Sequence, residues 1–364
     1  MKFQMFQLSQ EDPHVKLQAY ILDNSKEFQR DRLRPAIVIC PGGAFLGTSD
    51  REAEPIALRF AALGFHAFVL RYTTLYTEWP TDWTNLPPPR SGTAYPRPLL
   101  DLAKAMSKIR EHASDWHLDA DKIAVAGFSA GGYLAASLGT HWQDQFISDE
   151  LCEPSKRFRP NALILGYALL DYIAQKRELS IRGNENVYGL WQLSNQTLIG
   201  TSDPEVEQLK ALSPVNFVSE QTPPTFIWHT VEDSLVYDVN ALNFAIALAE
   251  HMVPYELHLF GNGDHGLSLA DITTASNPAD VNTDVAVWAE LAARWLKNNL
   301  SGSFHENVLL DSQTVQVNST ATIPKHLTRH STSPAPDEGA GFRALINIIR
   351  IECSFSGIGK GNKS

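Results

Sequence analysis

The sequence predicts an α/β protein whose mostly parallel sheet is covered by helices on both faces. Short apolar runs alternate with longer stretches of helical periodicity from about residue 36 to residue 298. Glycine-rich turns follow two of the apolar runs directly, at residues 41–44 and 127–132. A regular alternation of strand and helix is typical of parallel strands joined by crossover helices. The 364 residues, 43% of them hydrophobic, can bury a large core.

The first elements differ from this alternation. Residues 2–8 and 15–22 alternate apolar and polar side chains and are joined by a polar turn that contains Pro13. We expect them to form an antiparallel hairpin at an edge of the sheet. The strands expected after the hairpin cover residues 36–40, 65–70, 122–126, 162–166, 225–229 and 255–260. The expected helices cover residues 51–63, 97–112, 130–140, 238–251 and 281–298.

Two stretches interrupt the alternation, and each follows a strand, where the loops of an open α/β sheet build a binding crevice. Residues 72–96 carry Trp79, Trp83 and Tyr95 among several prolines, which favours a rigid, partly apolar wall of a cleft. The alternative is a surface loop that its tryptophans hold on the body of the protein. Residues 171–213 are mixed polar and are expected to form a small lid.

The composition changes near residue 301, beyond which Ser, Thr, Asn, Pro and Gly dominate. A stretch of this kind cannot bury enough apolar surface to order itself. We therefore expect residues 1–300 to form one α/β domain and residues 301–364 to be a poorly ordered tail.

Charge and composition exclude several classes of partner. The net charge of −11 argues against broad nucleic-acid binding, which requires a basic surface. No apolar run approaches the roughly 18 to 20 residues that cross a bilayer. The N-terminus lacks the apolar core and cleavage site of a signal peptide, so we expect a cytoplasmic location and no membrane partner. Cys40, Cys152 and Cys353 lack the C-x-x-C spacing of a metal or redox site and are interpreted as structural thiols.

The sequence Gly127-Phe128-Ser129-Ala130-Gly131-Gly132 carries the clearest chemical signal. It lies between an apolar strand-like run and a helix-like stretch, and small residues two before and two after a serine allow strand and helix to approach closely. This context predicts a strand, a sharp turn and a helix, with Ser129 as the nucleophile of a nucleophile elbow. The alternative is a glycine-rich turn with an idle serine.

A reactive serine requires a histidine as base and usually an acid that orients the histidine. His265 follows the last predicted strand in a glycine-containing loop, and Asp233 follows the strand at residues 225–229. The order serine, acid, histidine along the chain fits this reading. The weaker candidates for the base are His229, His251 and His258. Those for the acid are Glu232, Asp238, which is expected to cap the following helix, and Asp264.

Acyl transfer also requires hydrogen-bond donors aimed at the oxyanion. We expect one donor to be the backbone N–H of Ala130, and the others to be the amides of Gly43 and Ala44 in the turn Cys40-Pro41-Gly42-Gly43-Ala44-Phe45. The chain has neither the G-x-G-x-x-G of a dinucleotide site nor the Gly-Lys-Ser/Thr of a P-loop. The sequence thus implies no cofactor and no metal.

Together, the P-G-G-A-F turn, the G-F-S-A-G-G elbow and the loops of Asp233 and His265 resemble the α/β-hydrolase fold esterases, in detail the acetyl esterase and acetylxylan-esterase-like branch. The resemblance covers residues 36–296. Lipase-like relatives carry His-Gly-Gly-Gly where this chain has Pro41, so the turn must be braced differently. Arg51, Glu52 and Asp101 also match the family, and an internal salt-bridge network is the expected role for them.

The sequence therefore predicts a serine carboxylesterase that acts on short-chain esters, with acetyl as the expected acyl group and a sugar as one candidate alcohol. Its partner is a small-molecule ester, and the candidates for binding it are Phe45, Trp79, Trp83 and Tyr95. An amidase, peptidase or arylformamidase on the same fold is the alternative within the hydrolases. A non-catalytic binding protein with the hydrolase fold is the alternative from another class. The sequence does not indicate an oligomeric state.

Overall fold

The computed structural model describes residues 1–25, 27, 31–80, 82 and 85–300. One eight-stranded sheet forms its centre, with the strand order β1-β2-β4-β3-β5-β6-β7-β8. The pairs β1/β2 and β2/β4 are antiparallel, and all other pairs are parallel. The strands are β1 (Lys2–Gln7), β2 (Lys16–Ile21), β3 (Arg34–Cys40), β4 (His66–Arg71), β5 (Leu118–Phe128), β6 (Ala162–Gly166), β7 (Thr225–Thr230) and β8 (Tyr255–Phe260). The predicted fold class, including the antiparallel hairpin at one edge of the sheet, is confirmed.

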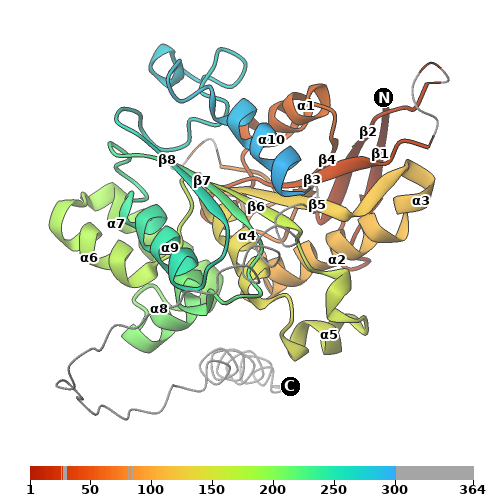
Figure 1. Ribbon diagram of the computed structural model, residues 1–364. Helices are drawn as coiled ribbons and strands as arrows, with labels where there is room; N and C mark the ends of the chain where they lie inside the picture. Colours follow the sequence, from red (N-terminus) through yellow and green to blue (C-terminus); the bar gives the residue numbers. More distant parts are fainter. Residues whose placement is uncertain (26, 28–30, 81, 83–84, 301–364) are drawn as a thin grey trace, which may run out of the picture.

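Helices cover both faces of the sheet (Figure 1). The α-helices are α1 (Glu54–Ala62), α2 (Arg97–Glu111), α3 (Ala113–Trp116), α4 (Ala130–His141), α5 (Gln145–Leu151), α6 (Tyr172–Arg182), α7 (Glu185–Ile199), α8 (Val206–Leu212), α9 (Val239–Glu250) and α10 (Trp288–Asn299). Short 3₁₀ helices lie at Asp50–Glu52, Ser155–Arg157, Pro214–Phe217 and Pro278–Asp280.

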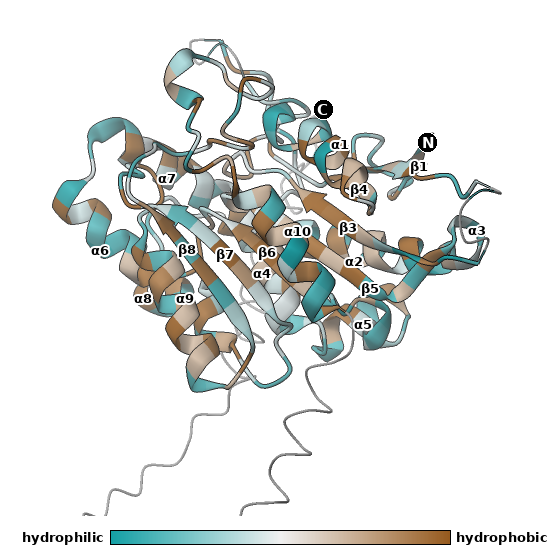
Figure 2. Cartoon of the chain, turned by 45° about the horizontal axis from the view of Figure 1, so that its top comes forward, coloured by the Kyte–Doolittle hydropathy of each residue, from teal (hydrophilic) through white to brown (hydrophobic). Residues whose placement is uncertain are grey.

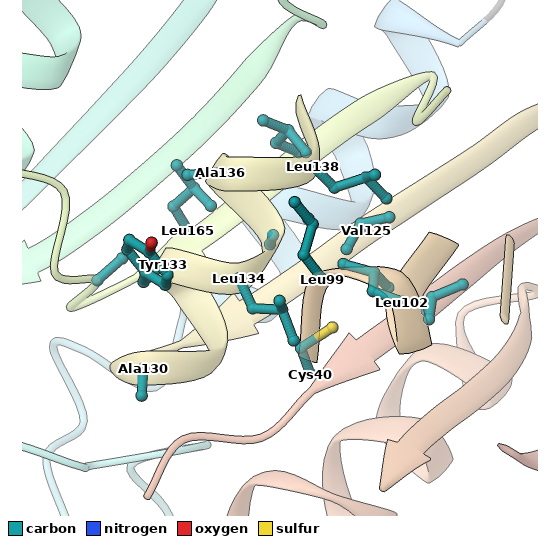
Figure 3. Close-up of a cluster of buried hydrophobic side chains, with 14 of the residues drawn as sticks. Cys40, Leu99, Leu102, Val125, Ala130, Tyr133, Leu134, Ala136, Leu138 and Leu165 are labelled. Atoms are coloured by element: carbon teal, nitrogen blue, oxygen red, sulfur yellow. The ribbon is translucent and has the colours of Figure 1, made fainter. Parts of the chain in front are cut away.

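Successive residues of the central strands enter different cores, because side chains alternate across a sheet. In β3, Val38 and Cys40 pack with α2, α4 and α9, whereas Ile37 and Ile39 pack with α1 and α10. Both faces of this strand are therefore apolar, and it is brown in the middle of Figure 2. Figure 3 shows part of the first core, where Leu134 and Leu138 of α4 lie beside α2 and β5.

The structure differs from the predicted elements in three places. The helix expected from residue 51 begins at Glu54, because Asp50–Glu52 form a separate 3₁₀ turn. The helix expected from residue 281 begins at Trp288, because the Asn282 side chain accepts the N–H groups of residues 284 and 285 in a separate turn. Residues 171–213, expected to form a small lid, contain the three helices α6, α7 and α8, for which no separate helices were predicted, and the side chains of Asp171 and Asn184 cap the first two.

Two of the three cysteines lie within the described residues. Cys40 is buried, as expected of a small apolar residue, whereas Cys152 is exposed. Cys353 and the predicted tail at residues 301–364 lie outside the described residues, as does Trp83.

Candidate active site

Ser129 occupies the turn between β5 and α4 with φ = 52° and ψ = −121°, a backbone conformation that L-residues rarely adopt. Its N–H donates to the Gly166 carbonyl at 3.1 Å. The neighbouring glycines have no room for a side chain: a Cβ at Gly127 would lie 2.1 Å from the oxygen of Gly131, and one at Gly131 would lie 2.0 Å from the oxygen of Cys40. The strand, sharp turn and helix expected around Ser129 are present, and the small residues are sterically required.

The structure brings Ser129, His265 and Asp233 together from three loops. The Ser129 Oγ atom lies 2.9 Å from Nε2 of His265, and Nδ1 of the same imidazole lies 2.7 Å from Oδ2 of Asp233. Both distances are those of hydrogen bonds. In this geometry the imidazole can accept the serine proton through one nitrogen while the carboxylate accepts a hydrogen bond from the other.

Asp233 is buried but well supplied with donors. Its Oδ1 accepts the N–H groups of Leu235 and Val236, each at 2.9 Å. Burial alone would raise the pKa of this carboxyl group, but the charge of His265 and the hydrogen bonds from His229 and His265 outweigh it and lower the pKa below the ordinary 3.8. The Asp233 side chain thus stays ionised beside the imidazole.

At His265, burial and neighbouring charge change the pKa in the directions opposite to those at Asp233. Burial would lower its pKa, but the nearby Asp233 carboxylate, with smaller effects of Glu52 and Asp264, raises the pKa above the ordinary 6.5. The surroundings of His265 therefore favour the protonated form of its imidazole.

The weaker candidates for the acid make other contacts. Glu232 is exposed and accepts the N–H of Gly263 at 3.2 Å. Asp264 accepts the N–H of His265 itself. Asp238 stands at the N-cap of α9 without a side-chain cap bond, contrary to the expected capping, and pairs with Arg182 at 3.4 Å.

The weaker candidates for the base lie in strands or at the end of a helix. His258 lies in β8 and contacts Glu256 at 2.7 Å, and His251 ends α9. His229 was expected to be a packed or solvated imidazole, and it is fully buried at the end of β7. It contacts the acid, since its Nε2 lies 3.3 Å from Oδ2 of Asp233.

The turn after β3 passes directly beside the elbow. A Cβ added to Gly42 would lie 2.8 Å from the Cβ of Ser129. Gly43 and Ala44 have φ values of 131° and 50°, and both line the cavity above Ser129. Among the described residues, the N–H groups of Gly43, Ala44 and Ala130 have no hydrogen-bond acceptor. These three amides are therefore available to a ligand at the site.

The expectation of an internal salt-bridge network around Arg51, Glu52 and Asp101 is only partly right. Arg51 pairs with Asp280 at 2.9 Å. Asp101 lies 3.8 Å from Arg97 and accepts hydrogen bonds from the N–H and the hydroxyl group of Thr73.

Glu52 has no ion pair among the described residues and instead braces the turn. It accepts the Gly42 N–H at 2.6 Å and the Tyr167 hydroxyl at 2.7 Å. The Tyr72 hydroxyl adds a hydrogen bond to the Pro41 carbonyl at 2.7 Å. The sequence showed that a different brace was needed at Pro41, but not that Glu52 and two tyrosines supply it.

A cavity of about 780 Å³ opens above Ser129 and His265. Its apolar part includes Leu190 of α7, Leu235 and Trp79, and the rest is largely polar, with residues of β2, β4 and the 3₁₀ turn. Within residues 72–96 the lining residues are Tyr72, Thr74, Thr77, Glu78, Trp79 and Arg90. The stretch 171–213 contributes Leu190.

Two of the residues predicted to bind substrate do not line this cavity. Phe45 has φ = 62°, which turns its ring inward against Tyr72 and Tyr133 at centroid distances of 6.2 and 5.7 Å. Tyr95 is buried in the same core. Both predictions are corrected, because these rings fill the core rather than face the cavity. Trp79 does line the cavity, and a Cβ at Gly43 would lie 3.2 Å from its Cε3 atom.

None of the helices in ranges 1–25, 31–80 and 85–300 is long and apolar enough to cross a membrane. In the same part of the chain, His, Cys, Asp and Glu side chains form no group of three or more that could hold a metal ion.

The sheet topology and the serine elbow define an esterase-like α/β hydrolase. Comparison with known proteins makes this class more specific: the chain belongs to the BD-FAE family, whose model matches residues 22–248.

Individual relatives agree with this family. The chain is 33% identical over 242 residues to endo-1,4-beta-xylanase B of Butyrivibrio fibrisolvens, covering 66% of this chain and 34% of the relative. The chain spans 34% to 54% of the length of the first three curated relatives that it matches.

Solved structures match over more of their own length. The acetyl ester-xyloside bifunctional hydrolase of Caldicellulosiruptor lactoaceticus is 32% identical with a TM-score of 0.62, over 81% of this chain and 96% of that one. The carboxylesterase Cest-2923 of Lactobacillus plantarum is 28% identical with a TM-score of 0.67, over 82% of this chain and 98% of that one.

Proposed function

We propose that this protein is a serine carboxylesterase that hydrolyses short-chain esters, with acetyl as the acyl group and a carbohydrate as the alcohol. The observation that carries the proposal is the continuous contact from Ser129 through His265 to Asp233 at the floor of the cavity. Two of the similar solved structures, a carboxylesterase and an acetyl ester-xyloside bifunctional hydrolase, support the ester and the sugar.

In the proposed reaction, Ser129 Oγ attacks the ester carbonyl while His265 Nε2 accepts its proton. Asp233 orients the imidazole and stabilises its charged form. The amides of Gly43, Ala44 and Ala130 donate to the oxyanion of the tetrahedral intermediate, an effect worth on the order of 3 kcal/mol for each donor. His265 then protonates the leaving alkoxide. Water releases the acid from the acyl-enzyme by the same proton transfers in reverse order.

The polar lining of the cavity supports a hydroxylated alcohol. Gln18, Thr48, Ser49 and Thr74 all line it, and these side chains can exchange hydrogen bonds with sugar hydroxyl groups. A long aliphatic chain would leave such groups unsatisfied. Leu190, Leu235 and Trp79 supply apolar side chains in the same cavity that could receive a short acyl group.

The first experiment tests whether Ser129 is a reactive nucleophile. A fluorophosphonate probe is expected to label Ser129 in the wild type but not in Ser129→Ala, and the exposed Ser180→Ala variant should label normally. Failure of the folded wild type to label would favour a non-catalytic binding protein.

A substrate panel then tests the bond that is cleaved. Rates are measured on esters of increasing acyl length, on acetylated xylan, and on an anilide and a formyl amide. We expect acetyl esters to be hydrolysed fastest. If an anilide or the formyl amide were hydrolysed faster than every short ester, the protein would be an amidase, peptidase or arylformamidase instead.

A further inference from the structure

Three loops at the carboxyl ends of β3, β6 and β8 are joined by hydrogen bonds that do not include the serine or its histidine. Glu52 lies after β3, Tyr167 directly follows β6, and Ser268 lies in the loop after β8. All three side chains are buried, with exposed fractions of 5%, 2% and 0%. Residues so far apart in sequence are brought together only by the parallel order of the strands.

Each carboxylate oxygen of Glu52 has a different partner. Oε2 accepts the N–H of Gly42 at 2.6 Å, one residue before the first proposed oxyanion donor. Oε1 accepts the hydroxyl of Tyr167 at 2.7 Å. Because each of its oxygens accepts one short hydrogen bond, the buried Glu52 side chain holds the turn after β3 against the loop after β6.

Tyr167 continues the connection to the histidine loop. Its hydroxyl oxygen accepts the N–H of Ser268 at 3.1 Å, and its ring lies edge-on against the imidazole of His265 with a centroid distance of 5.0 Å. Ser268 is further fixed by its Oγ, which donates to the Arg51 carbonyl at 2.6 Å, and by its own carbonyl, which accepts from Trp288. The histidine loop thus has little freedom relative to the turn that carries Gly43.

We propose that Glu52 and Tyr167 are positioning residues that hold the oxyanion turn and the His265 loop in fixed register around Ser129. The inference rests on the proposed function, since it assigns these groups to the same reaction. Neither residue needs to touch the reacting atoms. Small displacements of catalytic groups can cost about 100-fold in rate, so a link between the two loops has a measurable effect.

The test compares two tyrosines that differ in what their hydroxyl groups contact. Tyr167→Phe removes one hydroxyl that joins Glu52 to Ser268. Tyr172→Phe removes a hydroxyl that is equally buried but has no partner among the described residues. We expect Tyr167→Phe to lower kcat for an acetyl ester by about 10- to 100-fold with KM within about 2-fold, and Tyr172→Phe to leave both within about 2-fold.

Glu52 variants provide a second test that does not depend on the folding of Tyr167→Phe. Glu52→Gln keeps the size and one acceptor oxygen, whereas Glu52→Ala removes both acceptors, so kcat should decrease in the order wild type, Glu52→Gln, Glu52→Ala.

The outcomes separate the two proposals. If the wild type and Tyr172→Phe hydrolyse the ester and Tyr167→Phe equals them in kcat, or loses activity only through KM, the positioning role is wrong and the esterase remains. If kcat does not decrease in the order wild type, Glu52→Gln, Glu52→Ala, the positioning role is wrong as well. If the wild type does not hydrolyse any ester, both proposals are wrong.

Discussion

The imidazole of His229 lies against the carboxylate of Asp233, with Nε2 3.3 Å from Oδ2, and both side chains are fully buried. The same Nε2 lies 2.8 Å from the Val236 carbonyl. Val236 in turn donates its N–H to Asp233, so the strand end and the acid loop are fastened to each other. Asp233 therefore has a fixed orientation before any substrate binds, whereas its exposed neighbour Glu232 has no such support.

Asp233→Asn should lower kcat for an acetyl ester by about 10⁴-fold, because an amide can present its NH₂ to Nδ1 and favour the wrong imidazole tautomer. Glu232→Gln, a neighbouring change of the same kind, should stay within about 3-fold. Steady-state rates on one chromogenic acetate ester provide the comparison. A larger loss in Glu232→Gln would transfer the role of the acid to Glu232.

The pH dependence of kcat/KM should report His265. Only the neutral imidazole can accept the serine proton, so activity should rise with pH through the pKa of His265 in the free enzyme. Since Asp233 raises that pKa, the acid midpoint should lie above 6.5 in the wild type and move to lower pH in Asp233→Asn. A midpoint that is the same in both proteins would show that another group limits the acid side.

Gly42→Ala should impair the site through steric contact. The new Cβ would lie 2.7 Å from the Phe128 oxygen and 2.8 Å from both Glu52 Oε2 and the Cβ of Ser129. The turn must shift, which should lower the free energy of unfolding by about 1–3 kcal/mol and reduce kcat by at least about 10-fold.

Gly189→Ala is the matched control for this substitution. It adds the same methyl group inside α7, where nothing lies within 4 Å. It should keep full activity and raise the free energy of unfolding by about 0.5–1 kcal/mol. Thermal unfolding and ester hydrolysis are measured on both variants, and equal activity of the two would contradict the close approach of Gly42 to Ser129.

Leu190 is expected to limit the size of the acyl group, since it lines the cavity from α7. Leu190→Ala should raise the ratio of butyrate to acetate hydrolysis by several-fold, because about 1–3 kcal/mol of discrimination is typical of one side-chain difference in an apolar pocket. Tyr188→Ala, an exposed position on the same helix, should leave the ratio unchanged. An unchanged ratio in Leu190→Ala would place the acyl group elsewhere in the cavity.

The sequence alone could predict the parts of the site that depend on local patterns. Ser129 stands in a motif of short range, and Asp233 and His265 follow apolar strands in a recognisable order. Trp79, predicted to bind substrate, lines the cavity, and its role there stays a prediction. Phe45 was placed wrongly because the direction of its ring depends on a positive φ, which no sequence motif indicated.

The supporting residues could not be predicted for a different reason. Glu52 and Tyr167 are 115 residues apart, and only the neighbouring positions of β3, β5 and β6 in the sheet bring their loops together. The helices α6 to α8 were not predicted, although the caps at Asp171 and Asn184 were visible signals. His229 offered a signal as well, since it ends an apolar strand four residues before Asp233.

The order of the strands has a consequence for how the protein folds. Ser129 and His265 are 136 residues apart, and the cavity is lined by residues from His14 to Ser276, so contacts of long sequence separation must form before the site exists. Closing such large loops costs entropy before any contact offsets it, which makes folding slow. Hydrolysis should therefore return during refolding only once β8 pairs with β7 and brings the loop of His265 to Ser129, and a nascent chain that has not yet emerged beyond His265 should be inert.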